Sequence, residues 1–363
     1  MFMYRDLRKE LIIDYKHRCL RGQSAMTRLI LMFLFILGFL TGKPLLLLGE
    51  KPEIVSVKKI WDQAPHNAFT DLIRFQRKWF CIFREADFHG TRPTKAVMPE
   101  GKEGRNGEVR VIVSENGENW KSVALLREKG VDLRDPKLSV MADGRLMLLA
   151  GGIINDPKKK EQWGYLTRSP RVAFSKDGIN WTPTQRVLAE DHWLWRATWY
   201  QGKGYALSKM GETPNPRRGF LYWTTDGLNW QWLTEFKVKG VSETTLRVMP
   251  NGEMLALIRP RYLGRSLPPY KKWIFNEIDH SIGGPNFIRI TDGSLWAASR
   301  LQGKTVLSRM TTDSFDPVLT LPSGGGDTSY PGMVWHDQLL WISYYSSHEG
   351  QSSIYLAQIR FVS

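Results

Sequence analysis

The sequence has little of what would indicate a disulfide framework, a metal centre or a nucleotide site. It contains only two cysteines, Cys19 and Cys81, and the second lies in a strand-like apolar run, so no disulfide is expected. The 7 histidines are too far apart in the sequence to show a recognised metal-ligand spacing, and no metal site is expected. Gly324-Gly325-Gly326 precedes a strand rather than a helix, which argues against a phosphate-binding loop. We therefore expect no cofactor.

Long apolar stretches are also scarce, and the main one lies near the start of the chain. Leu29 to Leu40 is continuously apolar and follows Arg28, as in a secretory signal, but no small-residue cleavage site is evident. We expect residues 1–49 to be a signal peptide or an uncleaved membrane anchor, with residues 1–25 an artefact if translation starts at Met26. The protein would then be secreted or periplasmic, or anchored to a membrane. Residues 50–363 are expected to form one domain and a monomer.

The charge of the chain is one-sided. The formal net charge is +15, which favours anionic partners such as acidic glycans. The basic residues are spread along the chain rather than clustered, so nucleic acid is not expected as a partner.

Six similar units follow one another from His66 onward, each with material for four strands. The first strands are expected at Phe69–Phe75, Lys137–Met141, Ala197–Tyr200, Thr244–Met249, Asn286–Ile290 and Pro331–Trp335. The second strands are expected at Trp79–Phe83, Leu146–Ala150, Tyr205–Ser208, Glu253–Ile258, Ser294–Ser299 and Leu339–Tyr345. Asn-Gly and Asp-Gly turns supply the positive φ angles of two-residue hairpins. The pattern predicts an all-β fold, a six-bladed β-propeller of four-stranded antiparallel blades. Ile54–Lys59 is a spare strand that could close the ring.

A second repeated motif lies in the outer hairpins. It reads Ser114-Glu115-Asn116-Gly117-Glu118-Asn119-Trp120, Ser175-Lys176-Asp177-Gly178-Ile179-Asn180-Trp181 and Thr225-Asp226-Gly227-Leu228-Asn229-Trp230. These turns resemble the Asp-box of sialidases and related propellers, and their role is structural: polar side chains bind the backbone amides of the turn.

The tight turns occupy one rim, so a functional site is expected on the other. That rim carries the starts of the first strands and the ends of the second strands. Polar residues gather at these positions, and we select Asp71, Arg84, Arg134, Asp135, Arg196, Arg259 and Arg300. Several arginines on one rim favour a carboxylate or sulfate ligand, because guanidinium groups bind such anions bidentately. For Trp193, Trp195 and Trp199, packing within the blades is favoured over a sugar platform.

From about residue 60 to 360 the sequence resembles the sialidase superfamily. Gly240 to Leu246 and Leu255 to Arg259 are similar to the segment with the glutamate partner of the nucleophile and one arginine of the carboxylate-binding triad. Ala297-Ala298-Ser299-Arg300 resembles the segment of another triad arginine, and Asp327 to Gly332 that of the nucleophilic tyrosine.

The resemblance implies an exo-glycosidase that releases sialic acid or a related acidic sugar. Tyr330 would be the nucleophile, Glu243 would take its proton, and Arg259 and Arg300 would bind the carboxylate. The family's first-blade arginine is absent from His66 to Asp71, and Arg84 is the candidate substitute. The acid/base residue is assigned first to Asp87, with Asp71 and Asp135 as alternatives.

Two other functions remain open at this point. One is a glycan-active lyase or inverting hydrolase that uses His66, Asp71, Asp87 or Asp135. The other is a non-catalytic glycan-binding propeller, which would need aromatic platforms but no paired acid and nucleophile.

Overall fold

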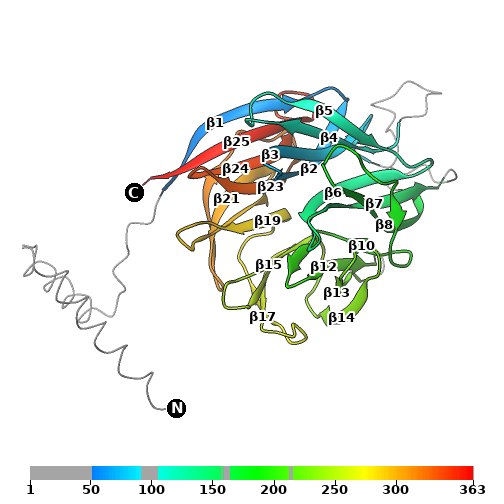
Figure 1. The fold of residues 1–363 in the computed structure, drawn as a ribbon. Helices are drawn as coiled ribbons and strands as arrows, with labels where there is room; N and C mark the ends of the chain where they lie inside the picture. Colours follow the sequence, from blue (N-terminus) through cyan, green and yellow to red (C-terminus); the bar gives the residue numbers. More distant parts are fainter. Residues whose placement is uncertain (1–50, 91–104, 157, 159–163, 212–215, 363) are drawn as a thin grey trace, which may run out of the picture. The chain divides into compact units, whose positions relative to one another are not determined.

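The six repeats expected from the sequence form six separate antiparallel sheets (Figure 1). The computed structural model describes residues 51–90, 105–156, 158, 164–211 and 216–362. Within these ranges the regular structure is β-strand, and Pro52–Val362 forms one unit by its own contacts. The predicted leader, residues 1–49, lies outside the described residues. Among the described residues, no helix is long and apolar enough to cross a membrane.

Each sheet corresponds to one blade, numbered here in chain order from the first complete repeat. Blade 1 has β2 (His66–Phe75), β3 (Lys78–Ala86), β4 (Glu108–Ser114) and β5 (Lys121–Leu126). Blade 2 has β6 (Asp132–Val140), β7 (Leu146–Asn155), β8 (Tyr165–Ser175) and β9 (Gln185–Arg186). Blade 3 has β10 (Trp193–Leu194), β11 (Thr198–Tyr200), β12 (Lys203–Met210), β13 (Arg218–Thr224) and β14 (Gln231–Phe236).

The other blades follow the same order. Blade 4 has β15 (Thr244–Val248), β16 (Met254–Ile258), β17 (Tyr262–Ser266) and β18 (Ile274–Glu277). Blade 5 has β19 (Gly283–Arg289), β20 (Leu295–Leu301), β21 (Lys304–Met310) and β22 (Phe315–Thr320). Blade 6 has β23 (Thr328–His336), β24 (Leu339–Ser346), β25 (Ser353–Val362) and, as its outermost strand, β1 (Lys51–Trp61).

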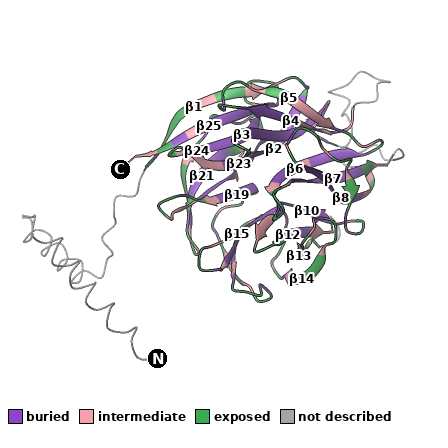
Figure 2. Ribbon diagram, viewed as in Figure 1, coloured by how far each residue is buried: buried purple, intermediate pink, exposed green. Residues whose placement is uncertain are grey.

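The pairing of β1 with β25 closes the ring. Figure 1 shows the blue β1 beside the red β25, so the first and last strands of the domain share one sheet. The spare strand predicted at Ile54–Lys59 therefore has the predicted role. The inner strands are mostly buried, whereas exposed segments concentrate on outer strands such as β1 and β14 (Figure 2).

The three Gly-Trp turns join the last two strands of blades 1 to 3 and pack each blade against a neighbour. In the second turn, Ser175 Oγ accepts a hydrogen bond from Gly178 N at 2.8 Å, and Trp181 Nε1 donates to Gly178 O at 3.0 Å. A side chain at Gly178 would meet Phe80 of blade 1 at 2.4 Å, so the turn packs directly on the preceding blade. In the third turn the hydroxyl partner is Thr224, one residue before the motif quoted above.

Candidate active site

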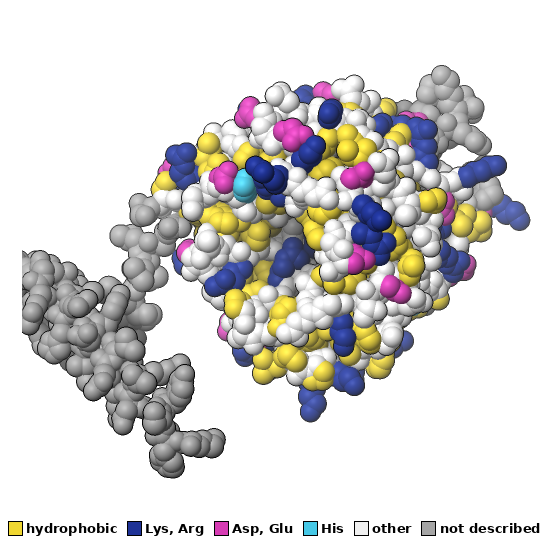
Figure 3. Space-filling view, viewed as in Figure 1, with side chains coloured by type: hydrophobic (Ala, Val, Ile, Leu, Met, Phe, Trp, Pro, Cys, Tyr) yellow, Lys and Arg dark blue, Asp and Glu magenta, His cyan; other side chains and the backbone are white. Residues whose placement is uncertain are grey.

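A cavity of about 940 Å³ opens among the starts of the inner strands. Six basic and three acidic side chains line it. The basic ones are Arg134, Arg168, Lys209, Arg217, Arg259 and Arg300, and the acidic ones are Asp135, Asp191 and Glu243. The space-filling view shows a hollow near the middle of the visible face with Lys and Arg side chains inside it (Figure 3). The excess of basic groups makes the cavity suited to an anionic ligand.

Tyr330 and Glu243 meet at this cavity. The Tyr330 hydroxyl donates to Glu243 Oε1 at 2.9 Å, and both side chains are only 7% exposed. Arg259 Nη1 donates to Glu243 Oε1 and Oε2 at 2.7 and 2.8 Å and lies 3.4 Å from the Tyr330 hydroxyl. The backbone N–H of Gly284 donates to Glu243 Oε2 at 2.8 Å. The carboxylate is thus fixed with one oxygen against the phenol.

Backbone bulges aim the key residues into the cavity. The register of β23 on β24 shifts between Ser329 and Gly332, and Tyr330 has a φ of 52°. Equivalent shifts in β2 and β6 carry Phe69 and Asp135 with φ of 62° and 50°, and both of these residues line the cavity. A bulge re-aims a side chain that a regular strand would direct into the sheet packing. Three blades therefore present a residue to the cavity through the same kind of bulge.

Two glycines allow the bulged Tyr330 to be accommodated. A Cβ atom on Gly332 would meet the backbone N of Leu72 at 2.1 Å, and one on Gly284 would meet the Tyr330 ring at 2.6 Å. Gly284 has a φ of 56°, so it is strained for a larger residue on backbone grounds as well. The ring therefore packs directly on the backbone that donates to Glu243.

The charges of the pair are set by its surroundings. Burial alone would raise the pKa of Glu243, but the Arg259 guanidinium, Lys209 and the Gly284 N–H together outweigh it and lower that pKa from 4.5 to about 2. Burial, and then the Glu243 carboxylate, raise the pKa of Tyr330 above its ordinary value. At neutral pH the pair is a neutral phenol hydrogen-bonded to an ionised carboxylate.

Arg300 lies against the same tyrosine. Its guanidinium carbon is 5.5 Å from the centroid of the Tyr330 ring. No carboxylate within the described ranges pairs with Arg300, whereas Arg259 is engaged by Glu243. Arg300 is therefore a cavity cation placed to bind an anionic group of a ligand.

Asp135 is the third acidic group near the tyrosine. It lines the cavity, and burial raises its pKa above the ordinary 3.8. No described residue forms a hydrogen bond with its carboxyl group. A carboxyl group whose pKa is raised by burial is suited to donate a proton.

Arg134 forms part of the cavity wall. Its Nη1 donates to Asp132 Oδ2 at 3.0 Å, its Nη2 donates to the backbone oxygen of His89 at 2.7 Å, and its guanidinium lies over the Phe69 ring. These contacts give the wall between blades 1 and 2 a fixed arrangement.

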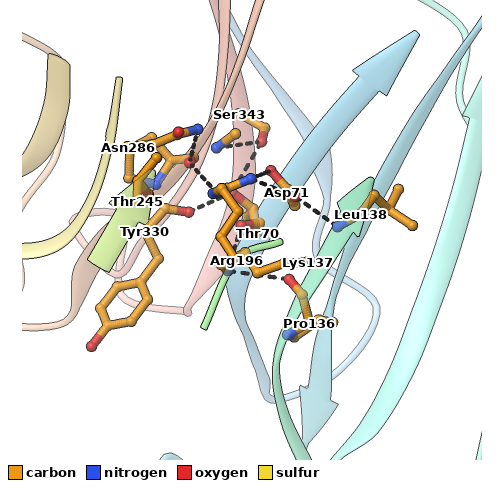
Figure 4. Close-up of polar contacts among 12 residues, drawn as sticks. Thr70, Asp71, Pro136, Lys137, Leu138, Arg196, Thr245, Asn286, Tyr330 and Ser343 are labelled. Carbon is orange, nitrogen blue, oxygen red and sulfur yellow. Dashed lines mark hydrogen bonds and ion pairs between the residues drawn. The ribbon is translucent and has the colours of Figure 1, made fainter. Parts of the chain in front are cut away.

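A buried polar network supports Tyr330 from beneath. Thr70 Oγ1 donates to the backbone oxygen of Tyr330 at 2.9 Å, while Arg196 Nη1 binds both oxygens of Asp71 at 2.7 Å. Figure 4 shows the Tyr330 side chain pointing away from this network, whose hydrogen bond to Tyr330 is made to the backbone oxygen. Lys137 Nζ donates to the Thr70 backbone oxygen at 3.0 Å and lies 4.7 Å from the Trp195 ring centroid. The network sets the position of the bulge rather than contacting a ligand.

Lys137 gives this network a pH-dependent contribution to stability. Burial, and then Arg196, lower the pKa of Lys137 from 10.5 to about 8. Between these values the unfolded chain binds more protons than the folded one, so the free energy of unfolding contributed by Lys137 increases as the pH rises through this window. We expect urea denaturation to show a smaller gain from pH 7.5 to 9.5 in Lys137→Met than in the wild type. An equal gain in both proteins would contradict this assignment.

The structure brings some of the predicted site residues together and places others elsewhere. Tyr330, Glu243, Arg259, Arg300, Arg134 and Asp135 all line the cavity. Asp71 and Arg196 form the buried pair beneath it. The acid/base assignment to Asp87 has no support from its position, because its Oδ2 accepts from Arg105 N at 2.7 Å and it is not among the described lining residues.

Arg84 does not replace the missing first-blade arginine. Its side chain is fully buried, with Nε and Nη2 bonded to Asp132 at 2.9 and 3.1 Å and Nη1 bonded to the Phe88 oxygen. A guanidinium that is already satisfied in this way cannot turn to a ligand without breaking its buried ion pair with Asp132. Its role is structural, between blades 1 and 2.

The sequence reasoning missed His89, Arg168 and Arg217 of the cavity lining, and it favoured a packing role for Trp193. Lys209 lies near the end of β12 on the predicted rim and was noted there, but it was not selected as a site residue. Trp193 lines the cavity, Trp195 is buried against Tyr330 at 5.6 Å between ring centroids, and Trp199 donates to Ser139 Oγ between blades 2 and 3.

Histidines far apart in the sequence also meet beside the cavity. His66 Nε2 and His89 Nδ1 lie 2.8 and 2.6 Å from the same oxygen, Oδ2 of Asp327. The Tyr345 hydroxyl donates to the other oxygen, Oδ1, at 2.6 Å. The sequence pattern predicted no metal site, yet the fold forms a group of two imidazoles and one carboxylate.

Comparison with known proteins reveals similarity of fold. No protein-family model and no curated protein matches the sequence. Among solved structures, a protein of unknown function from Dyadobacter fermentans superposes with a TM-score of 0.72 at 17% identity, over 85% of this chain and 99% of the other.

Two of the similar structures are glycosidases. Trypanosoma rangeli sialidase superposes with a TM-score of 0.64 at 12% identity, over 86% of this chain, which spans 58% of the sialidase. A variant of an α-L-arabinofuranosidase from Fusarium graminearum superposes with a TM-score of 0.64 at 13% identity, over 85% of this chain and 98% of the other. The six-bladed propeller of this chain is thus an architecture that glycosidases also use.

Proposed function

We propose that the protein is a retaining glycosidase that releases a sugar carrying an anionic group, such as sialic acid. The observation that carries the proposal is the 2.9 Å hydrogen bond between Tyr330 and Glu243 at the base of a basic cavity. A tyrosine nucleophile suits such a sugar because a neutral phenol is not repelled by the substrate's carboxylate, as an Asp or Glu nucleophile would be.

The reaction would proceed in two steps. The Tyr330 oxygen attacks the anomeric carbon while its proton passes to Glu243, and the glycosidic oxygen leaves with a proton from Asp135. A water molecule then attacks the same carbon and gives a proton to Asp135, while Glu243 returns the first proton to Tyr330. Asp135 takes the acid/base role here because it lines the cavity and Asp87 does not.

Arg300 and Arg259 would bind the anionic group. Arg300 is the stronger candidate because no described carboxylate pairs with it, while Arg259 also holds Glu243. The fold alone does not distinguish an acidic sugar from an uncharged one, because the similar structures include an arabinofuranosidase. The excess of basic side chains in the cavity favours the acidic sugar.

Hydrolysis of a panel of fluorogenic glycosides by the wild type and Glu243→Gln tests the proposal. The panel holds a sialoside, a uronide, a sulfated hexoside and an uncharged arabinofuranoside. We expect turnover of an acidic member, and a loss of about 10²- to 10⁴-fold in Glu243→Gln, which removes the proton acceptor. The control is Glu253→Gln, because Glu253 lies at the tight-turn rim of the same blade. Turnover of the arabinofuranoside alone, or an active Glu243→Gln, would contradict the proposal.

Arg300→Met is expected to weaken substrate binding more than chemistry. A charge-assisted hydrogen bond contributes about 1.5–3 kcal/mol, so KM for the acidic substrate should rise roughly 10- to 100-fold with a smaller change in kcat. Arg309→Met, at an exposed position of β21 in the same blade, is the matched control. An unchanged KM in Arg300→Met would show that the anionic group binds elsewhere.

A further inference from the structure

We propose that His66, His89 and Asp327 form a binding site for a divalent transition-metal cation of the Zn²⁺ class at the wall of the cavity. The three residues come from separate parts of the chain. His66 begins β2, His89 follows β3, and Asp327 immediately precedes β23. Blade 6 therefore supplies the carboxylate, and blade 1 supplies both imidazoles.

The ligand atoms already converge. His66 Nε2, His89 Nδ1 and an oxygen of Asp327 all lie within 4.8 Å of one another. Both nitrogens point at a single oxygen, Asp327 Oδ2, from 2.8 and 2.6 Å. Tetrahedral ligands at Zn²⁺ distances are separated by roughly 3.3 Å, so each imidazole nitrogen needs to move away from Asp327 Oδ2 by only about 0.5–0.7 Å to admit the ion.

The donor set selects the class of metal. Two imidazole nitrogens and one carboxylate oxygen suit Zn²⁺ and its first-row neighbours, whereas Ca²⁺ and Mg²⁺ prefer oxygen ligands only. Three protein ligands leave a fourth position for water or a substrate atom. This pattern is that of an open site rather than a closed structural one.

The surroundings hold the ligands in place. The Tyr345 hydroxyl donates to Asp327 Oδ1 at 2.6 Å, which leaves Oδ2 for the metal. The His66 and His89 rings pack edge to face at 5.2 Å, with Phe69 between them and Tyr330. Arg134 holds the backbone oxygen of His89 at 2.7 Å. Hydrogen bonds of this kind to ligating groups usually support affinity in metal sites.

A metal ion can reach the site from the cavity side. His66 is buried, but the side chains of His89 and Asp327 are 33% and 23% exposed, and His89 lines the cavity. A cation there would lie on the wall of a cavity already rich in basic groups. It would add a Lewis-acidic position for an anionic or hydroxyl group of the ligand.

Metal titration of the purified full-length protein tests this proposal without reference to catalysis. After chelation and removal of the chelator, we expect Zn²⁺ to bind with one ion per chain by calorimetry, and Co²⁺ to give the visible absorption bands of a tetrahedral complex. His89→Ala should weaken binding by at least about 10- to 100-fold and remove the Co²⁺ bands. His89 lies at the cavity wall. A thermal melt in the absence of metal checks that the His89→Ala variant is folded.

The matched control is His336→Ala. His336 Nε2 lies 3.0 Å from an Asp337 oxygen at the opposite rim. This pair offers one imidazole and one carboxylate, whereas the proposed site offers two imidazoles and one carboxylate. We expect this variant to bind metal as the wild type does, and Tyr345→Phe to weaken binding less than His89→Ala does. Failure of the wild type to bind one ion, or equal affinities in His89→Ala and His336→Ala, would overturn the proposal. The metal titration does not measure glycoside hydrolysis, so a protein without glycosidase activity would still give a valid result for metal binding.

Discussion

Replacing Tyr330 with Phe is expected to reduce hydrolysis of an acidic glycoside by at least about 10³-fold, because the reaction loses its nucleophile. The substitution removes one oxygen atom and leaves the ring against Gly284 and Phe69. The loss should therefore be in kcat, with the melting temperature nearly unchanged. Steady-state kinetics with the acidic member of the glycoside panel provides the measurement.

Tyr344→Phe is the control for this experiment. Tyr344 is also buried and neighbours Tyr345 in β24, but its hydroxyl donates to the Pro322 backbone oxygen, and it is not among the described lining residues of the cavity. Similar kinetics in both variants would contradict the assignment of Tyr330 as nucleophile.

Arg196→Met is expected to give the largest loss of stability, about 3–5 kcal/mol in the free energy of unfolding, because it leaves the buried Asp71 carboxylate without its cation. Arg196 binds both Asp71 oxygens at 2.7 Å, and Asp71 is 1% exposed. Asp71 keeps only the Leu138 backbone N–H, at 2.8 Å, as a described hydrogen-bond donor. Urea denaturation of the wild type and the variant measures the difference.

Arg218→Met is the control for the stability measurement. Arg218 pairs with Glu235 at 2.9 Å on the surface of blade 3, where an ion pair contributes less than about 1 kcal/mol. Equal losses in the two variants would show that the buried Arg196–Asp71 ion pair contributes no more to the free energy of unfolding than the surface pair does. The double variant Asp71→Leu with Arg196→Met should recover part of the loss, since no buried charge is then left unpaired.

The propeller could be predicted because its signals are local. Tight turns between apolar strands, repeated six times, identify the inner hairpins, and Ile54–Lys59 stood out as a strand without a partner. The Tyr330 and Glu243 pair could be predicted only through resemblance to a family. Nothing in the spacing of these two residues brings their side chains together.

The bulges could not be predicted from the sequence because contacts between blades determine them. The sequence predicted the first strand of the last blade from Pro331, whereas β23 starts at Thr328 and bulges at Tyr330. The bulge requires Gly332 because the backbone of Leu72, in another blade, leaves no room for a side chain. Such a requirement is not visible in a hairpin pattern.

The role of Arg84 was misassigned, and the histidine group was missed, for a related reason. The sequence shows an arginine at a strand end on the predicted rim, but not that Asp132 of the next blade binds it in the interior. His66 and His89 are separated from Asp327 by 261 and 238 positions, so no local spacing could indicate their meeting. Their convergence depends on closure of the ring between blades 1 and 6.

Trapping of a covalent intermediate tests the central claim most directly. A fluorinated analogue of the acidic sugar that the protein hydrolyses, with a good leaving group, should form a glycosyl-enzyme that breaks down slowly. Peptide mass spectrometry should then locate the added sugar on Tyr330, and Tyr330→Phe should carry no adduct. An adduct on another residue, or turnover of the analogue with inversion at the anomeric carbon, would contradict the account.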